Sequence, residues 1–372
     1  MGQHLITFGS LAAGTLAIGC IVSAPALGQQ TMTIEEYDPK STLVVPEHHV
    51  PRAKFPFIDV HGHMRRVPTG AGLAEWVAAM DSLNLRVYVN LSGGSGEELA
   101  GRRRALEAAY PGRFVVFANI DFDGIGNPGW TEQTVRTFRA DVTERGAVGL
   151  KIFKNLGMDL RDTSGERVPV DDPRLDPVWA AAGELGVPVL IHTGEPIAFF
   201  DPVDEHNERW LELTQIPNRR RPPEEYLTWE ALMTEQHHMF AKHPNTRFIN
   251  AHLGWMGNDL GRLARLLDSL PNVYTEMGAV LYELGRQPRF ARQFLIDYQD
   301  RVMMGKDSWA PDEFPYYFRV FETADDYVPY YRKRHAFWRL YGLDLPDEVL
   351  RKIYYENALR VIPGIDGAMF SR

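Results

Sequence analysis

Two histidines, His61 and His63, stand two residues apart at the end of a short apolar run. In an extended segment, side chains two residues apart project from the same side, so both imidazoles would face one space. Three further polar residues end later runs of the same kind, namely His192, His252 and Asp307. Imidazole and carboxylate groups suit Zn²⁺, and also Mn²⁺ or Fe²⁺. These residue types therefore predict one divalent metal site, with Zn²⁺ as the first choice.

Such a site needs a fold that brings distant segments together. From about residue 55, short apolar runs alternate with longer amphipathic segments, which is typical of β-α units around a parallel sheet. Eight runs are expected to be strands: Phe57–His61, Leu85–Asn90, Phe114–Ile120, Gly149–Phe153, Pro188–His192, Arg247–His252, Val273–Met277 and Val302–Gly305. Seven segments are expected to be helices: Leu73–Ser82, Glu97–Tyr110, Thr131–Arg145, Pro177–Leu185, Pro223–Lys242, Leu260–Leu270 and Pro288–Tyr298. We therefore predict an α/β fold, a (β/α)₈ TIM-like barrel. The site residues would end strands one, five, six and eight and converge on one cavity.

One interval between the predicted strands is much longer than the others. It carries a long insertion after strand five, from Thr193 to about Arg221, which is rich in charge, proline and aromatic residues. This insertion should form a loop over the C-terminal face of the barrel, where sites of this fold are built. The C-terminal tail, Pro311 to Arg372, is expected to be mainly helical and to pack against the barrel. One domain, residues 55–372, is therefore expected.

The first 28 residues contain no Asp, Glu, Lys or Arg, and the run from Leu11 to Val22 consists of small and mainly aliphatic residues. We interpret residues 1–28 as a signal peptide, so the protein is expected to be secreted or periplasmic. The spacing of small residues before Cys20 also resembles a lipoprotein cleavage site, which leaves a lipid anchor as an alternative and an uncleaved membrane anchor as a further one. No later stretch approaches the roughly 18 apolar residues of a membrane span. Residues 29–54 are expected to be an extended lead-in.

Composition narrows the classes of partner. The net charge is −9 and the sequence pI is about 5.8, so no basic field is available to neutralise a nucleic-acid backbone. A small-molecule substrate is expected instead. The single cysteine, Cys20, excludes an internal disulfide and any cysteine-cluster metal site, so nitrogen and oxygen ligands must hold the metal. A homo-oligomer is compatible with this composition.

The motif Ile58-Asp59-Val60-His61-Gly62-His63, followed by His192, His252 and Asp307 at later strand ends, resembles the amidohydrolase superfamily. Within it, the sequence is similar to the "amidohydrolase 2" group, which includes aminocarboxymuconate-semialdehyde decarboxylase and related lactonases. The closing segment 355–360 extends the resemblance over about residues 55–363. The resemblance implies metal ligation by His61, His63, His192 and Asp307, with His252 beside the metal-bound water. The segment 305–309 departs from the group's usual sequence, so the resemblance does not identify the substrate.

The chemistry expected at such a metal follows from its charge. A bound divalent ion lowers the pKa of its water toward about 7, so hydroxide becomes available near neutral pH. Asp307 and His252 are the expected catalytic residues, the first as proton acceptor and the second as hydrogen-bond donor or proton shuttle. The first hypothesis is a hydrolase of a lactone, amide or ester in a small, anionic or cyclic substrate. The alternatives are a nonoxidative decarboxylase of an aromatic or muconate-like acid and an inactive barrel that only binds a ligand.

Four more side chains are candidate substrate contacts. Strand alternation points Lys151 into the barrel, where it would contact a substrate carboxylate, form a structural ion pair, or become carbamylated and hold a second metal. Trp255 and Trp309 each follow a site residue and could form a flat wall for a cyclic substrate, with ordinary packing as the alternative. Arg65 would pair with an anionic substrate if it reaches the site, and is otherwise a solvated surface residue. Asp59 is expected to hydrogen-bond a ligand histidine or to tie the strand end.

Overall fold

The computed structural model describes residues 32–335 and 337–370. Internal contacts divide the chain into two compact units, Met1–Ser41 and Thr42–Arg372. The described residues of the first unit contain a turn at 34–36 and no helix or strand. The predicted signal peptide, 1–28, lies outside the described residues, so export of the protein stays a prediction.

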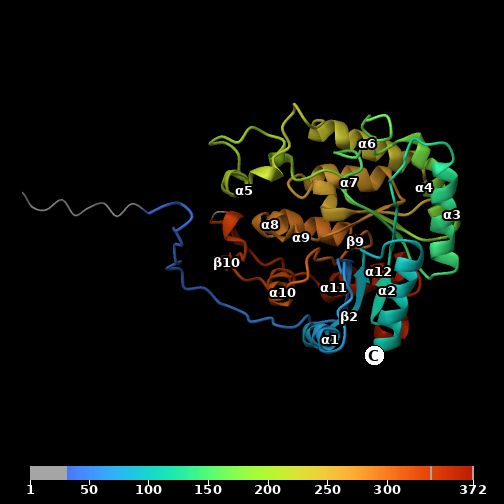
Figure 1. The fold of residues 1–372 in the computed structure, drawn as a ribbon. Coiled ribbons are helices and arrows are strands. Elements are labelled where there is room, and N and C mark those ends of the chain that lie inside the picture. Colours follow the sequence, from blue (N-terminus) through green and yellow to red (C-terminus); the bar gives the residue numbers. More distant parts are fainter. Residues whose placement is uncertain (1–31, 336, 371–372) are drawn as a thin grey trace, which may run out of the picture. The chain divides into compact units, whose positions relative to one another are not determined.

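Eight parallel strand segments of the second unit close into a barrel (Figure 1). Backbone pairing runs in sequence order from β1 to β3 and from β4 to β9, and Val60 N donates to Met304 O at 3.0 Å to join the last strand to the first. The predicted (β/α)₈ fold is therefore confirmed. The strands are β1 Phe57–Gly62, β2 Leu85–Asn90, β3 Phe114–Val116, β4 Ala118–Asn119, β5 Leu150–Ile152, β6 Val189–Ile191, β7 Phe248–Asn250, β8 Val273–Glu276 and β9 Val302–Met303.

The third strand differs from the prediction of one continuous run over Phe114–Ile120. It is interrupted at Phe117, because the chain changes partners there: Phe117 N donates to Asn90 O of β2, whereas Ala118 N donates to Gly149 O before β5. β3 and β4 together thus form the third strand of the barrel. The Phe117 side chain is fully buried and belongs to the hydrophobic interior of the barrel.

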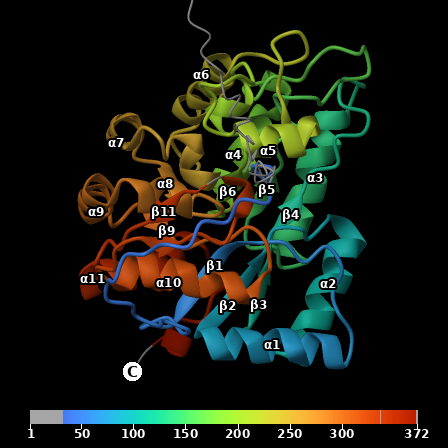
Figure 2. The ribbon, with the colours of Figure 1, turned by 90° about the vertical axis from the view of Figure 1, so that its left-hand side faces the viewer.

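Helices surround the strands on the outside (Figure 2). Figure 2 shows α2 and α3 along one side, α7 and α9 along the other, and α1 below the strands. The main helices are α1 Ala71–Leu83, α2 Gly96–Ala109, α3 Trp130–Thr143, α4 Asp176–Glu184, α6 Trp229–Lys242, α7 Leu260–Ser269, α8 Leu281–Arg286 and α9 Pro288–Asp297. The helix predicted over Pro223–Lys242 begins only at Trp229, because the Thr228 side chain accepts from Ala231 N and caps it. Among the described residues, no helix is long and apolar enough to cross a membrane.

The insertion and the tail pack on each other through buried charges. The insertion contains α5, Trp210–Gln215, whose fully buried Glu212 binds Arg209 of the insertion and His335 of the tail. The predicted helical tail contains helices but also a short antiparallel pair, which periodicity does not show. Its elements are α10 Phe314–Glu322, β10 Val328–Pro329, β11 Arg339–Leu340, α11 Asp347–Arg351 and α12 Asn357–Val361.

Phe248 in β7 shows how the outer core is held together. Its ring is fully buried and lies 4.8 Å from Phe240 and 6.5 Å from Trp179, centroid to centroid. We expect Phe248→Ala to lower the free energy of unfolding by about 3–5 kcal/mol, because it leaves a cavity between the sheet and α6. Chemical denaturation measures this loss. The exposed Phe290→Ala is the control and should change stability by less than about 0.5 kcal/mol.

Candidate metal centre

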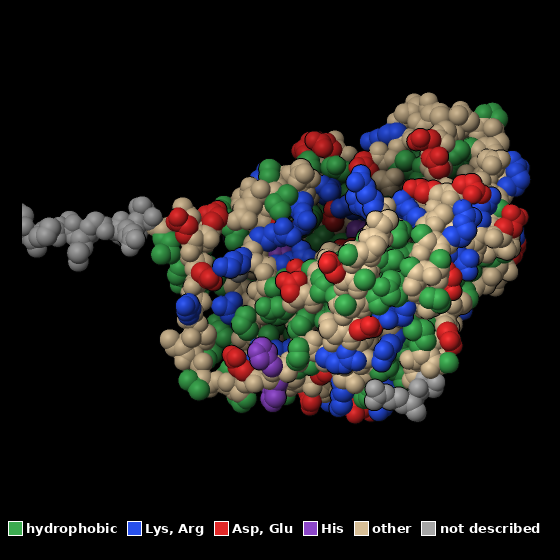
Figure 3. All heavy atoms as spheres, turned by 60° about the horizontal axis from the view of Figure 1, so that its bottom comes forward, with side chains coloured by type: hydrophobic (Ala, Val, Ile, Leu, Met, Phe, Trp, Pro, Cys, Tyr) green, Lys and Arg blue, Asp and Glu red, His purple; other side chains and the backbone are tan. Residues whose placement is uncertain are grey.

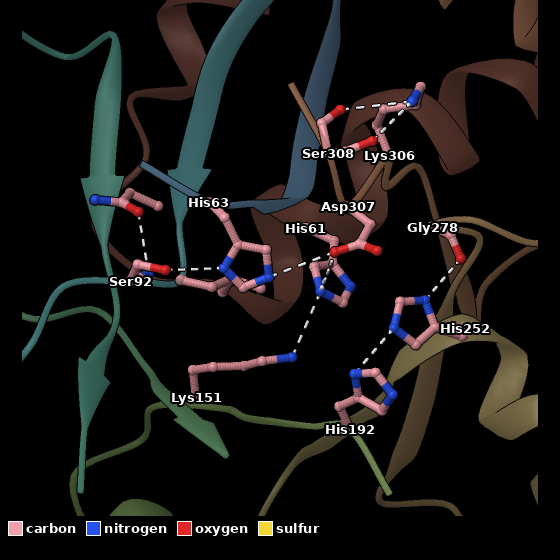
Figure 4. A network of polar contacts seen from close by, with 12 residues as sticks. His61, His63, Ser92, Lys151, His192, His252, Gly278, Lys306, Asp307 and Ser308 are labelled. Carbon is pink, nitrogen blue, oxygen red and sulfur yellow. Dashed lines mark hydrogen bonds and ion pairs between the residues drawn. The ribbon is translucent and has the colours of Figure 1, made fainter. Parts of the chain in front are cut away.

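His61 and His63 leave the end of β1 with their rings directed toward Asp307 (Figure 4). His61 Nδ1 lies 2.8 Å from Glu276 Oε1, and His63 Nδ1 lies 2.9 Å from Ser92 Oγ. The Nε2 atoms are 3.6 Å and 3.5 Å from Asp307 Oδ1. The Glu276 carboxylate requires His61 Nδ1 to carry the hydrogen, which leaves the lone pair on Nε2 facing Asp307.

The protonation states suit a cation at this point. Burial lowers the pKa of His61 well below its usual value, and burial followed by the charge of Lys151 lowers the pKa of His63 to about 4. Burial would raise the pKa of Asp307, but the positive charge that the side chains around it can carry, Lys151 among them, lowers it to about 2. Neutral imidazoles and an ionised carboxylate are the forms that bind a divalent metal.

His252 and His192 form a second part of the centre. His252 Nδ1 donates to Gly278 O at 2.7 Å, so its Nε2 accepts from His192 Nδ1 at 3.2 Å (Figure 4). His192 Nε2 then keeps a lone pair, and this atom is buried without a hydrogen-bond partner among the described residues. A buried nitrogen of this kind is a natural ligand for a metal or substrate.

The donor set fits a divalent metal. One group with ligand atoms within 4.8 Å of one another consists of His61, His63 and Asp307, and a second consists of His61, His252 and Glu276. The prediction placed His192 in the same ligand set as the first group. In the structure it belongs to neither group and reaches the centre through His252. Two imidazoles and a carboxylate would hold the ion, and His192 Nε2 has a free lone pair to add.

Glu276 is the residue of the centre that sequence reasoning missed. It is fully buried at the end of β8, where Oε1 accepts from His61 Nδ1 and from His252 N at 2.7 Å, and Oε2 accepts from Gly278 N at 2.5 Å. A Cβ at Gly305 would lie 2.1 Å from Oε2, so only glycine leaves room for this carboxylate. Glu276 thus positions both histidines at once.

Asp59 was predicted either to hydrogen-bond a ligand histidine or to tie the strand end, and its contacts fit the second role. Its Oδ1 accepts from His61 N at 3.1 Å and from Lys306 N at 3.0 Å, so it ties the ends of β1 and β9 together. The imidazole of His61 is oriented by Glu276 instead. Asp59 therefore closes the barrel beneath the metal centre.

Backbone strain is concentrated at the centre. His252, Leu253 and Trp255 have φ of 59°, 55° and 53°, and Asp307 has φ of 79°. Left-handed φ angles cost non-glycine residues free energy and persist where the surrounding structure enforces them, often at functional sites. Three of these strained residues, His252, Trp255 and Asp307, are candidate site residues of the sequence analysis.

The four candidate substrate contacts differ in position. The Trp255 ring stacks on His252 with centroids 4.5 Å apart and lies 5.6 Å from His192, so it forms a wall of the centre. The Trp309 ring stacks on Trp76 at 4.2 Å, which is the packing alternative. Arg65 is exposed to solvent and acts on His63 only through its charge. A role of Trp309 or Arg65 in binding substrate gains no support from these contacts.

Lys151 points into the barrel, as alternation predicted. Its side chain is buried, with Nζ 3.5 Å from His61 Nε2 and 5.6 Å from the centre of the Phe153 ring. No carboxylate of the described residues lies within ion-pair distance of Nζ, so the structural ion pair is not formed. Burial lowers the pKa of Lys151 to about 8.

We expect Lys151→Met to raise KM for anionic substrates about tenfold or more while leaving KM for neutral substrates nearly unchanged. The change removes the one cation beside His61 and keeps the length of the side chain. Steady-state kinetics on a matched pair of charged and neutral substrates measures the difference. An equal effect on both substrates would contradict a carboxylate contact, and loss of a second metal equivalent by elemental analysis would indicate carbamylation.

One face of the molecule has a hollow with basic side chains around it. Figure 3 shows lysine and arginine side chains around this hollow, with histidine visible inside it. After β6, Glu195 binds Lys154 and Arg221, with Arg221 Nη2 at 2.9 Å, and the charge of Lys154 acts on His192. Arg221 ends the insertion, so this ion pair joins the insertion to the segment after β6, and the position of the insertion over the site stays a prediction. The Asp307 side chain remains 37% exposed, so water reaches the metal centre.

Comparison with known proteins places the chain in a family. The family model described as amidohydrolase matches residues 58–364. The chain belongs to the amidohydrolase family. This confirms the resemblance read from the His61 motif, and the protein is an enzyme of the amidohydrolase superfamily with a candidate metal site. A comparison with curated proteins finds no match.

Solved structures support the amidohydrolase fold at low sequence identity. An amidohydrolase II shares 16% identity, with 82% of this chain and 99% of that chain covered and a TM-score of 0.51. A dihydroxybenzoic acid decarboxylase from Polaromonas, with bound manganese and the inhibitor 2-nitroresorcinol, shares 15% identity over 82% and 96% with a TM-score of 0.50. An uncharacterised TIM-barrel protein from Bordetella bronchiseptica shares 15% identity over 86% and 100% with a TM-score of 0.50.

Proposed function

We propose that this amidohydrolase hydrolyses a carbonyl bond, in a lactone, amide or ester, of a small substrate that carries a negative charge. The observation that carries the proposal is an ionised, water-accessible carboxylate, Asp307, held between the Nε2 atoms of His61 and His63. Hydrolysis needs water as a reactant, and the exposed fraction of Asp307 supplies access for it. The basic rim explains the preference for an anion.

Each residue of the metal centre has its own role in the proposed hydrolysis. A bound divalent ion would polarise the carbonyl oxygen and acidify water. Asp307 accepts the proton of the attacking water and returns it to the leaving oxygen or nitrogen as the bond to carbon breaks. His252 is fixed by Gly278 O on one side and by His192 Nδ1 on the other, and Trp255 limits water on one side. His61 and His63 would hold the ion, and Zn²⁺, Mn²⁺ and Fe²⁺ all suit these donors.

Nonoxidative decarboxylation of an aromatic or muconate-like acid is the second candidate. The observation in its favour is the buried Lys151 ammonium beside His61, where a cation could hold a carboxylate at the reacting centre. A decarboxylase from Polaromonas shares the fold. Both candidates use the same metal ligands, so products and not ligand mutants distinguish them.

The test combines elemental analysis with an activity screen. Purified protein loaded with Zn²⁺ or Mn²⁺ is assayed on lactones, esters, amides and aromatic carboxylates, and products are identified by mass spectrometry. We expect one metal per chain and addition of water to a carbonyl bond, faster for substrates with a carboxylate. Carbon dioxide release without hydrolysis would contradict the hydrolase, and no turnover by metal-loaded protein would contradict both candidates.

We further propose that the protein is exported, because residues 1–28 have the composition of a signal peptide. Fractionation of cells that express the full chain tests this, with N-terminal sequencing of the product. A mature protein that begins near residue 29 is expected, and one that begins at Cys20 and partitions into detergent would indicate a lipid anchor. Full-length protein in the cytoplasm would contradict export.

A further inference from the structure

Buried polar atoms without partners are concentrated in one part of the tail. Among the described residues, six of the sixteen buried side-chain polar atoms that lack a hydrogen-bond partner lie between positions 317 and 335. Three of them are the hydroxyls of Tyr317, Tyr330 and Tyr331, and a fourth is Arg332 Nε. Buried polar groups nearly always have partners, so such a group of donors indicates that something else completes them.

The four side chains lie together, and we call them the tyrosine–arginine cluster. The rings of Tyr330 and Tyr331 are 4.7 Å apart, and the Arg332 guanidinium carbon is 5.5 Å from the centre of the Tyr331 ring. Burial raises the pKa of Tyr317 and of Tyr330 well above the usual value, and Tyr331 acts on both. The phenols of Tyr317 and Tyr330 are thus uncharged donors at neutral pH.

The charge of Arg332 is not compensated within the described residues. No ion pair joins it to a carboxylate of 32–335 or 337–370, and the phenols of Tyr330 and Tyr331 interact with its charge. Burial alone would lower the pKa of Arg332, but these phenols outweigh burial and keep it above its usual value. A second cation, Lys306, contacts the Tyr331 ring at 5.7 Å but pairs with Glu313. One net positive charge therefore remains.

We propose that the tyrosine–arginine cluster binds the carboxylate group of a small molecule. The planar guanidinium of Arg332 matches a carboxylate, the phenol hydroxyls supply further donors, and one net positive charge matches one carboxylate. The cluster lies beside the side chain of Lys306, whose ammonium is 5.7 Å from the centres of the Tyr317 and Tyr331 rings and whose chain neighbour is Asp307. The bound carboxylate is either the remote end of the substrate, which rests on the proposed function, or a separate compound.

Calorimetric titration with benzoate tests the site, and benzamide, which has the same ring and no charge, is the control ligand. We expect one benzoate per chain and at least about tenfold weaker binding of benzamide. Arg332→Gln should weaken benzoate about 10- to 100-fold, and Tyr331→Phe about threefold to tenfold. Arg289→Gln, at an exposed arginine, should bind as the native protein does.

Benzoate at the metal centre would give a different result, because it would persist in Arg332→Gln. Equal binding to native protein and Arg332→Gln, equal binding of benzoate and benzamide, or no benzoate binding to native protein would overturn the proposal. Far-UV circular dichroism verifies that the variants are folded. Tyr331→Phe, which removes one oxygen only, keeps the proposal falsifiable if Arg332→Gln does not fold.

Kinetics then distinguish the two sources of the carboxylate. If the substrate supplies it, Arg332→Gln raises KM for a substrate with a remote carboxylate and leaves kcat and the neutral analogue unchanged. If a separate compound supplies it, benzoate binding is lost and KM is the same for both substrates. Both results support the site. Failure of the proposed function, which would appear as no hydrolysis of any substrate, leaves the benzoate titration intact.

Discussion

Asp307→Asn is expected to lower kcat/KM by about 10²- to 10⁴-fold, the range that proton-transfer residues contribute. The amide keeps the size of the side chain but cannot accept the proton of water, and it removes the negative charge that faces His61 and His63. Metal content should fall as well, because the site loses its carboxylate ligand. Steady-state kinetics with the fastest substrate of the screen and elemental analysis measure the two effects separately.

Asp312→Asn is the matched control, since it makes the same change at an exposed position five residues later. It should retain native activity and metal content. If Asp307→Asn keeps kcat/KM within tenfold of the native value while Asp312→Asn is unaffected, Asp307 is not the proton acceptor. This result would support the alternative of an inactive barrel that only binds a ligand, because no residue would then be assigned as proton acceptor.

The positions of the site residues could be predicted because the side chains of a barrel strand alternate regularly and the strands end at one face. His61 and His63 obey strand alternation, and His192, His252 and Asp307 end runs that become parallel strands. The C-terminal ends of such strands meet at one face, so residue type and position suffice to predict a shared cavity. The structure brings all five together, although His192 arrives through a contact with His252.

Glu276 could not be predicted in the same way. In the run Val273–Met277 it follows Thr275 and shares a strand face with Tyr274, so the pattern is the same as that of a solvated position. Its role depends on His61, which lies 215 residues earlier, and on the space left by Gly305. The tyrosine–arginine cluster is similar, because it depends on how the tail folds back beside Lys306. The roles of these residues depend on contacts between elements that are distant in the sequence, and local sequence patterns do not show such contacts.

Glu276→Gln is expected to weaken metal binding about 10- to 100-fold, as loss of a group that orients a ligand histidine does. The carboxylate accepts from His61 Nδ1 and His252 N on one oxygen and from Gly278 N on the other. Glutamine has one carbonyl oxygen, so its NH₂ group must face a donor on one side. The free energy of unfolding should fall by about 1.5–3 kcal/mol for the same reason.

Glu322→Gln is the matched control, because Glu322 is a part-buried glutamate that, like Glu276, accepts from a backbone amide, Lys54 N at 3.0 Å, and also from Tyr354 Oη at 2.8 Å. It should lower stability without changing metal affinity, measured by competition with a chromogenic chelator. Equal metal affinity in native protein and Glu276→Gln would show that His61 is held by the barrel alone. A stability loss in both variants with a metal defect only in Glu276→Gln separates positioning of the ligand from general support of the fold.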